Sequence, residues 1–139
     1  MSQAKIRAAL EKHLIAWKNA SYPTLKFYPE NKKSPTTDAL FVTTQLFPDS
    51  VLNPSIGGEH KRYSGRYRVV LQHQNIDKGI GATEAIAESL VDWFKRGDIY
   101  AQAGQTINIE RTPALRPSFI DGMYVVIPVD VFYRSDVIN

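Results

Sequence analysis

Histidines, the side chains best suited to proton transfer near neutral pH, are few and far apart in this sequence. There are three, at His13, His60 and His73, and imidazole alone has an ordinary pKa between pH 5 and 8. None has a neighbour in the sequence that would make it a convincing general base. His13 falls beside the apolar stripe of an expected helix, where a histidine is most often an edge-of-core or surface residue. The histidines therefore predict no acid–base site.

Metal and phosphate chemistry find little support in the residue pattern. The chain has no cysteine, so the usual zinc patterns cannot be written, and we assign no metal and no cofactor. Gly79 and Gly81 precede an expected helix, and helix N-termini can bind anions through their amide hydrogens. The dinucleotide fingerprint needs a third glycine at position 84, where Glu84 would repel phosphate. We interpret these glycines as a flexible turn into the helix.

The carboxylates that could serve a hydrolase or nuclease are scattered through expected turns and strand ends, at Asp77, Asp98, Glu110, Asp121 and Asp130. Asp130 differs from the others because it lies between Val129 and Val131, inside the last expected strand. Either its face of the sheet is exposed, which we favour, or an arginine across the sheet holds the carboxylate. A single carboxylate cannot supply both an acid and a base. We therefore assign no catalytic residue and expect no enzyme activity.

The highest concentration of charge lies in residues 61–68, which contain Lys61, Arg62, Tyr63, Arg66, Tyr67 and Arg68. Arginine with tyrosine is typical of protein interfaces and also of nucleic-acid grooves. We predict a partner-binding set of Lys61, Arg62, Tyr63, Arg66 and Arg68. Strand alternation places Arg66 and Arg68 on one face. The alternative is a solvated strand edge whose charges discourage unwanted pairing.

Two amphipathic helices are expected to support the fold. The first begins near Ser2 and ends near residues 18–21, with an apolar stripe at Ile6, Leu10, Leu14 and Trp17. The second lies between Gly81 and Gly97, with apolar positions at Ala82, Ile86, Leu90, Trp93 and Phe94.

Strands are indicated by period-two patterns at residues 25–27, 39–47, 66–73 and 124–133, and by a hairpin of residues 99–101 and 106–109 turned at Gly104. We expect a long mobile loop at about 49–64, another loop punctuated by Pro113 and Pro117, and a short C-terminal tail at 135–139. The predicted fold class is α+β, a mainly antiparallel sheet with two helices packed on one face and a long loop after the second strand.

Composition limits the size and class of the protein. With 139 residues, of which 43% are hydrophobic, residues 1–139 are expected to form one domain. No apolar run approaches the roughly 20 residues of a membrane span, and the first residues lack the apolar stretch of a secretory signal. The net charge of +3 is well short of that of a dedicated nucleic-acid binder.

In its order of motifs the chain resembles the terminator-like proteins, also called tail completion or minor tail proteins, of long-tailed phages and prophages. The resemblance begins with the helix Ile6 to Leu14 and the following Ala16, Trp17 and Asn19, then the strand Leu40 to Pro48 and a glycine-bearing basic loop. It continues with Gly65, Tyr67 to Leu71, and the helix with Ala82, Ala87, Leu90 and Phe94 closed by Gly97. The final block contains Ile107, Ile109, Pro113, Pro117, Gly122, Tyr124, Pro128, Val129, Tyr133 and Arg134.

This resemblance implies a non-enzymatic structural protein that forms a homo-oligomeric ring, usually a hexamer, on the head-proximal end of the tail tube. Such a ring ends tube polymerisation and supports joining to the head. The implied partners are further copies of the chain, the tail tube protein and the head-tail connector protein, with DNA passing through the lumen without specific binding and no membrane. The implied location is the virion tail, assembled in the cytoplasm of the host bacterium. The alternative from a different class is a small nucleic-acid-binding module that uses the basic segment from Lys61 to Arg68.

Overall fold

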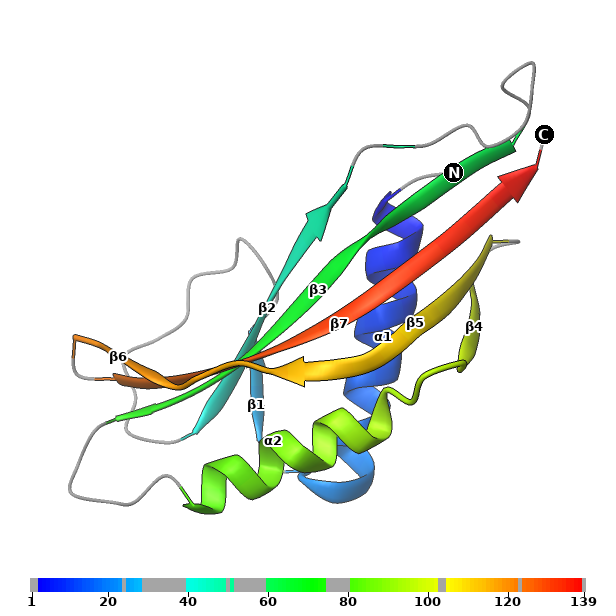
Figure 1. The fold of residues 1–139 in the computed structure, drawn as a ribbon. Coiled ribbons are helices and arrows are strands. Elements are labelled where there is room, and N and C mark those ends of the chain that lie inside the picture. The colour runs from blue at the N-terminus through cyan, green and yellow to red at the C-terminus, as the bar shows by residue number, and fades with distance from the viewer. Residues whose placement is uncertain are drawn as a thin grey trace.

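The computed structural model describes residues 3–23, 25–28, 40–49, 51, 60–74, 81–102, 105–122 and 124–138 (Figure 1). In chain order its elements are α1 (Gln3–Ser21), β1 (Lys26–Tyr28), β2 (Phe41–Pro48), β3 (His60–Gln74), α2 (Gly81–Trp93), β4 (Ile99–Gln102), β5 (Gln105–Leu115), β6 (Phe119–Asp121) and β7 (Tyr124–Ile138).

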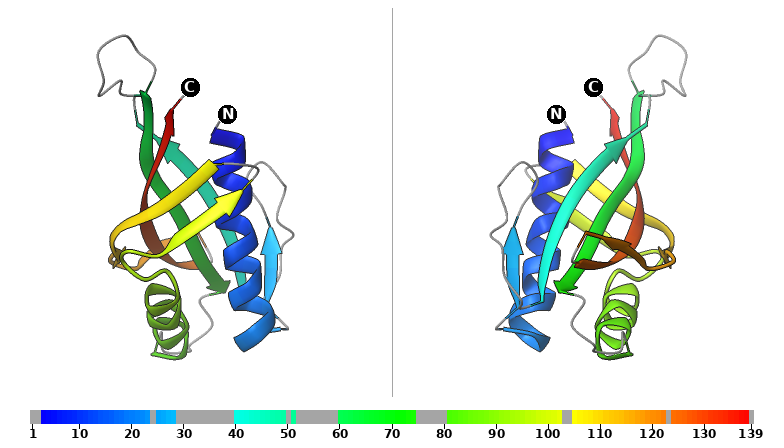
Figure 2. Two further views of the ribbon diagram at one scale, coloured as in Figure 1. Left: turned by 90° about the vertical axis from the view of Figure 1, so that its right-hand side faces the viewer. Right: turned by 90° about the vertical axis from the view of Figure 1, so that its left-hand side faces the viewer.

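The strands form one sheet in the order β1-β2-β3-β7-β5-β4, with β6 paired to β7. Only the β1–β2 pair among these strands is parallel. Figure 2 shows that the sheet curls, so that β4 and β5 run obliquely to β2 and β3. Register shifts in β5 around Arg111 accompany this curl, because bulges bend and twist a strand. The prediction of an α+β fold with two helices and a mainly antiparallel sheet is confirmed.

The core lies between the helices and the two longest strands. The predicted stripe of α1 is buried at Ile6, Leu10, Leu14 and Trp17, each at most 1% exposed. The buried side chains of α2 are Thr83, Ala87 and Leu90, and Phe94, directly after the helix, is buried as well. The facing positions of the sheet are Tyr67, Val69 and Leu71 on β3 and Ile127, Val129, Val131 and Tyr133 on β7. One continuous hydrophobic cluster therefore holds both helices and the sheet together.

The long loop expected at 49–64 is wrong for residues 60–64. These residues begin β3 and pair with the end of β7, from His60 opposite Ile138 to Ser64 opposite Arg134. Their polar composition suggests a loop, but neither of the described helices covers the face that carries Arg62, so charged side chains are compatible with strand structure there. Residues 50 and 52–59 of the expected loop lie outside the described residues.

The expected C-terminal tail is also wrong over most of its length, because residues 135–138 continue β7. Ser135 is fully buried, pairs with Tyr63 of β3 and Ile107 of β5, and donates its hydroxyl hydrogen to the Thr106 carbonyl at 2.7 Å. Neighbouring strands on both sides thus extend β7 beyond its apolar stretch.

The loop expected around Pro113 is replaced by strand structure as well. Strand β5 runs through Pro113 to Leu115, and the shift of register between Arg111 and Ala114 accommodates the proline. Proline donates no backbone hydrogen bond, so within a sheet it is tolerated at such irregularities. In the described part of the chain no helix is long and apolar enough to cross a membrane.

Candidate functional site

The basic segment of β3 divides its side chains between the two faces of the sheet. Arg62, Arg66 and Arg68 alternate with Tyr67 and Val69, which are buried in the core, so the arginines project from the opposite face. The prediction that Arg66 and Arg68 share a face is therefore confirmed. The alternative of a strand edge is wrong for Arg66 and Arg68, because both pair with β2 on one side and β7 on the other. Lys61 and Arg62 lie beyond the β2 pairing and pair with β7 alone.

The other two residues of the predicted set do not join these arginines. Tyr63 is half-buried and packs against the core cluster on the helix side of the sheet. Lys61, next to it, is exposed and alternates with Arg62. Of the five residues, the structure thus places Arg62, Arg66 and Arg68 on one face, brings Arg66 and Arg68 together beside Phe47, and directs Lys61 and Tyr63 away from them.

Asp130 lies on the face of the sheet that carries Arg66 and Arg68, which we call the outer face, and it has no solvent exposure. Its two oxygens accept a bidentate pair of hydrogen bonds from Arg68, with Nε at 2.7 Å and Nη2 at 3.0 Å. Arg116 donates from Nε at 2.9 Å, and Arg66 Nη1 lies 3.9 Å from Oδ2. The favoured interpretation of Asp130 as an exposed residue is therefore wrong, and the alternative, an arginine holding it across the sheet, is confirmed.

The electrostatics of this cluster keep Asp130 charged. Burial by itself raises the pKa of the carboxyl group, but the hydrogen bonds and positive charges of Arg68 and Arg116 outweigh it and hold the pKa below its ordinary value. The hydrogen bond to Asp130 in turn raises the pKa of Arg68. Asp130 is thus an ionised anchor that fixes the arginines around it.

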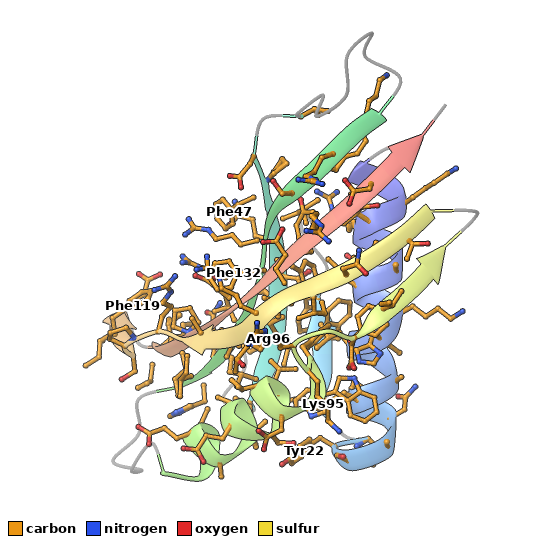
Figure 3. All side chains as sticks on the ribbon, turned by 45° about the vertical axis from the view of Figure 1, so that its right-hand side comes forward. Tyr22, Phe47, Lys95, Arg96, Phe119 and Phe132 are labelled. Carbon is orange, nitrogen blue, oxygen red and sulfur yellow. The ribbon has the colours of Figure 1, made fainter. Side chains whose placement is uncertain are left out.

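Two phenylalanines on the same face support the guanidinium groups. The Arg66 guanidinium lies 4.7 Å from the centre of the Phe47 ring, and that of Arg68 lies 5.5 Å from it. Arg111, from β5, lies 3.7 Å from the centre of the Phe132 ring. All three distances are within the range of cation–π attraction, which restricts the arginines to defined positions. In Figure 3, Phe47, Phe132 and Phe119 lie on the side of the sheet away from α1.

We define the arginine face as Arg66, Arg68, Arg111 and Arg116 with Asp130, Phe47 and Phe132. An open hollow of about 430 Å³ lies beside it, lined by Phe47, Pro48, Asp49, Gly65, Arg66, Arg111 and Phe132. Toward the end of β7, Asp136 binds Arg62 Nε at 2.8 Å and Arg134 Nε at 3.3 Å. The outer face is thus a cationic surface with aromatic rings among the charges.

The sequence did not indicate Arg111 and Arg116 as part of this surface. They lie more than 40 residues after Arg68, in a stretch expected to be a loop, and reach Arg66 and Arg68 because β7 pairs with both β3 and β5. The signal available was the unusual aspartate inside the last strand, which required cationic partners if it was buried.

Among the described residues, the remaining candidates do not form a second site. His13 lies on α1 and packs between aromatic rings of Trp93 and Tyr100. His73 lies on β3, but it is buried and alternates with the arginines, in step with Tyr67, Val69 and Leu71 of the core. Asp77 and Gly79 lie outside the described residues, as does the side chain of His60. Within the described ranges, no group of three or more histidines or carboxylates is arranged to hold a metal ion.

Comparison with known proteins agrees with the motif order. The sequence profile of the family described as phage tail terminator protein matches residues 5–133. One solved structure superposes with a TM-score of 0.77 and 24% sequence identity, covering 97% of this chain and 96% of the other, which establishes a shared fold. No curated protein sequence matches the chain. Because the profile covers nearly the whole sequence, including every residue of the arginine face, the chain belongs to the phage tail terminator protein family.

Proposed function

We propose that this protein forms a homo-oligomeric ring, a hexamer, that caps the phage tail tube, ends its polymerisation and supports joining to the head. The observation that carries this proposal is the family match over residues 5–133. Membership makes the chain a structural protein of the phage tail, and the ring with its place on the tube is our inference from it. We infer no chemical step and no cofactor.

The fold offers what a ring of identical subunits requires. A closed ring is built from heterologous contacts, in which two different surfaces of one subunit meet complementary surfaces of its neighbours. Here the arginine face lies on one side of the sheet, and the helices pack on the core at the other side. Each subunit can therefore present two distinct surfaces at the same time.

The proposed partners are other copies of the chain, the tail tube protein and the head-tail connector protein, in a virion tail assembled in the bacterial cytoplasm. DNA would pass through the lumen without specific binding. A net charge of +3 suits such a passage, because a strongly basic lining would retain DNA electrostatically.

Growth of tail tubes in the presence of the purified protein tests the proposal. Tube protein polymerised with increasing amounts of this chain should give progressively shorter tubes in electron micrographs, with extra density at one end. Bovine serum albumin at equal concentration serves as the control for crowding. Tubes of unchanged length with bare ends would contradict the proposed function.

The alternative, a nucleic-acid-binding module, is weakened by the geometry of the basic segment. Arg68 uses both Nε and Nη2 on Asp130, and Arg62 uses Nε on Asp136, so these donors are already engaged within the subunit. The alternative requires duplex DNA to bind the isolated protein with an affinity that falls steeply with salt, because phosphate contacts release counterions. Fluorescence anisotropy with labelled DNA at two salt concentrations distinguishes the two functions.

A further inference from the structure

Helix α2 carries a row of exposed carboxylates. Glu84, Glu88 and Asp92 are spaced four residues apart and all are exposed, whereas Ala87 and Leu90 on the other side of the helix are fully buried. The helix contains no lysine, arginine or histidine between residues 81 and 93. A rise of about 1.5 Å per residue places successive carboxylates about 6 Å apart along about 12 Å. We call these three residues the acidic stripe.

Within the described part of the chain, the acidic stripe has no cationic partner. Among the residues that the structure describes, no hydrogen bond or ion pair involves Glu84, Glu88 or Asp92. Three like charges on one side of a short helix repel one another, which costs stability unless cations from elsewhere approach them. The stripe therefore has the charge and exposure of a contact surface.

The arginine face has the opposite charge and leaves donors available. Four arginines outnumber the two carboxylates near them, Asp130 and Asp49. Arg111 forms no ion pair with any residue in the described ranges, and Arg66 approaches Asp130 at 3.9 Å. Guanidinium groups that rest on phenylalanine rings keep their planar donor edges oriented, which favours bidentate binding of carboxylates.

The spacing of the two surfaces is similar. Arg66 and Arg68 are two residues apart on one face of β3, which corresponds to about 7 Å. Arg111 on β5 is separated from β3 by β7, which corresponds to about 10 Å. The carboxylates of the acidic stripe, about 6 Å apart, and the guanidinium groups of the arginine face, about 7 to 10 Å apart, therefore have similar enough spacings to form several ion pairs at once.

The two surfaces also lie on different sides of the subunit. The arginines project from the sheet face opposite Tyr67 and Val69, and α2 packs through Ala87 and Leu90 on the cluster that contains those two residues. One subunit can therefore use both surfaces without the two competing. Repetition of such a contact produces a closed ring or an open chain, but not a closed symmetric dimer.

We propose that the acidic stripe of one copy binds the arginine face of the next copy, so that the occupant of the arginine face is a second molecule of this chain. The proposal rests on the proposed function in that a ring needs a repeated heterologous contact, and it names the two surfaces that form it. Charge complementarity favours this occupant over a nucleic acid, since the chain itself supplies the carboxylates.

Two charge-reversed proteins test the contact. One is Arg66→Glu with Arg111→Glu, and the other is Glu84→Lys with Glu88→Lys. In sedimentation velocity at low salt, where the wild type is expected to associate, each double variant should self-associate at least about tenfold more weakly, since like charges then meet across the contact. Each variant should remain folded, because surface replacements of this kind usually have small effects on stability, and thermal melts check this.

Mixing the two variants provides the decisive measurement. The variant with the reversed arginine face keeps its acidic stripe, and the variant with the reversed stripe keeps its arginine face, so these two unchanged surfaces can still bind each other. The two reversed surfaces also carry opposite charges and can bind each other. An equimolar mixture should recover association that neither variant shows alone. The control is Lys12→Glu with Lys26→Glu, two exposed lysines on α1 and β1, and it should associate as the wild type does.

Three results would overturn the proposal: a wild type that stays monomeric at high concentration and low salt, double variants that associate normally, or a mixture that remains monomeric. Binding of duplex DNA to the arginine face in place of self-association would also overturn it. These results are separate from the tube assay. If the double variants associate like the wild type and still cap tubes, only the proposed contact is refuted. If the wild type associates through these surfaces but has no effect on tubes, only the proposed function is refuted.

Discussion

Asp130 shows how a charged residue is accommodated in the middle of a long strand. Its carboxylate is removed from water, and the hydrogen bonds from Arg68 and Arg116 replace the lost hydration. The arginines themselves remain partly exposed, so their charges stay solvated while they cover the aspartate. A carboxylate in this environment orders the side chains of a surface without being accessible itself.

Replacing Asp130 by asparagine should lower the free energy of unfolding at pH 7 by about 1 to 3 kcal/mol, because hydrogen bonds to charged groups are lost. The folded-state pKa of Asp130 is depressed, so its stabilisation is present above the unfolded-state pKa of about 4 and disappears as the pH falls below it. Urea unfolding at pH 7 and pH 3 should therefore show a difference between wild type and variant that shrinks in acid. Asp121→Asn, at an exposed position of β6, controls for the loss of one charge. An equal difference at both pH values would contradict this account.

Gly65 is required by the close approach of β2, β3 and β7. A Cβ atom at this position would clash with the Phe47 carbonyl oxygen. It would also lie 2.7 Å from the Tyr133 hydroxyl oxygen and 2.9 Å from the Pro48 Cα atom. Gly65→Ala should cost about 1 to 3 kcal/mol through overpacking. Gly81→Ala is a matched control, because an added Cβ at Gly81 meets no atom within 4 Å and alanine favours the helix. Chemical denaturation of both variants measures the contrast, and equal stabilities would show that the sheet yields at Gly65.

At the scale of elements, His13 joins α1 to the end of α2 and to β4. Its ring stacks on Trp93 at 4.9 Å and on Tyr100 at 4.1 Å between centroids. The Trp93 indole Nε1 donates to the His13 carbonyl at 2.9 Å, and His13 Nε2 lies 3.4 Å from the Trp93 carbonyl oxygen. These contacts fix where the C-terminal end of α2 lies against α1, and with it the orientation of the acidic stripe.

Protonation of His13 should weaken this junction. Burial lowers the pKa of His13 and outweighs the opposing effects of the Trp93 carbonyl and Asp98. Because the unfolded chain, with a pKa of about 6.5, binds the proton more readily, stability is lost as the pH falls below that value. Thermal melts between pH 7.5 and about 5.5 should show a decrease for the wild type that is smaller in His13→Phe. His60→Gln should retain the wild-type decrease, and an unchanged pH dependence in His13→Phe would refute the assignment.

At the scale of the whole molecule, one face of the central strands carries the apolar cluster shared with α1 and α2, and the other carries arginines and aromatic rings. Burial of apolar side chains on the face with the cluster contributes most of the free energy that stabilises the domain. Arginine and aromatic side chains are enriched where proteins bind one another, so the arginine face has the composition of an interface.

Self-association through the arginine face should raise the apparent stability. A binding partner that recognises only the folded subunit stabilises it by mass action, so the melting temperature depends on protein concentration. At low salt the wild type should melt at higher temperature as its concentration increases, and the Arg66→Glu, Arg111→Glu variant should not. Differential scanning fluorimetry over a wide concentration range measures this, with added salt reducing the effect by screening. Identical, concentration-independent melting of both proteins would exclude a role for this surface in association.

Local pattern in the sequence was sufficient for the two helices, the central parts of β2, β3 and β7, and the β4–β5 hairpin, whereas the family was indicated by a resemblance in the order of motifs. Burial of one stripe or one face imposes periods of 3.6 or 2 residues, and these periods are visible without a structure. The pattern failed at the ends of β3 and β7, where the hydrogen bonds of neighbouring strands, and not apolar side chains, maintain the extended chain.

The arginine face was decided by tertiary structure alone. Arg68, Arg111 and Arg116 meet around Asp130 and Phe132 because β7 pairs with β3 on one side and β5 on the other. Strand order and register are set by the packing of the whole sheet against both helices, which involves residues far apart in the chain. A local sequence pattern carries no record of which strands become neighbours, so it could identify the charges but not their convergence.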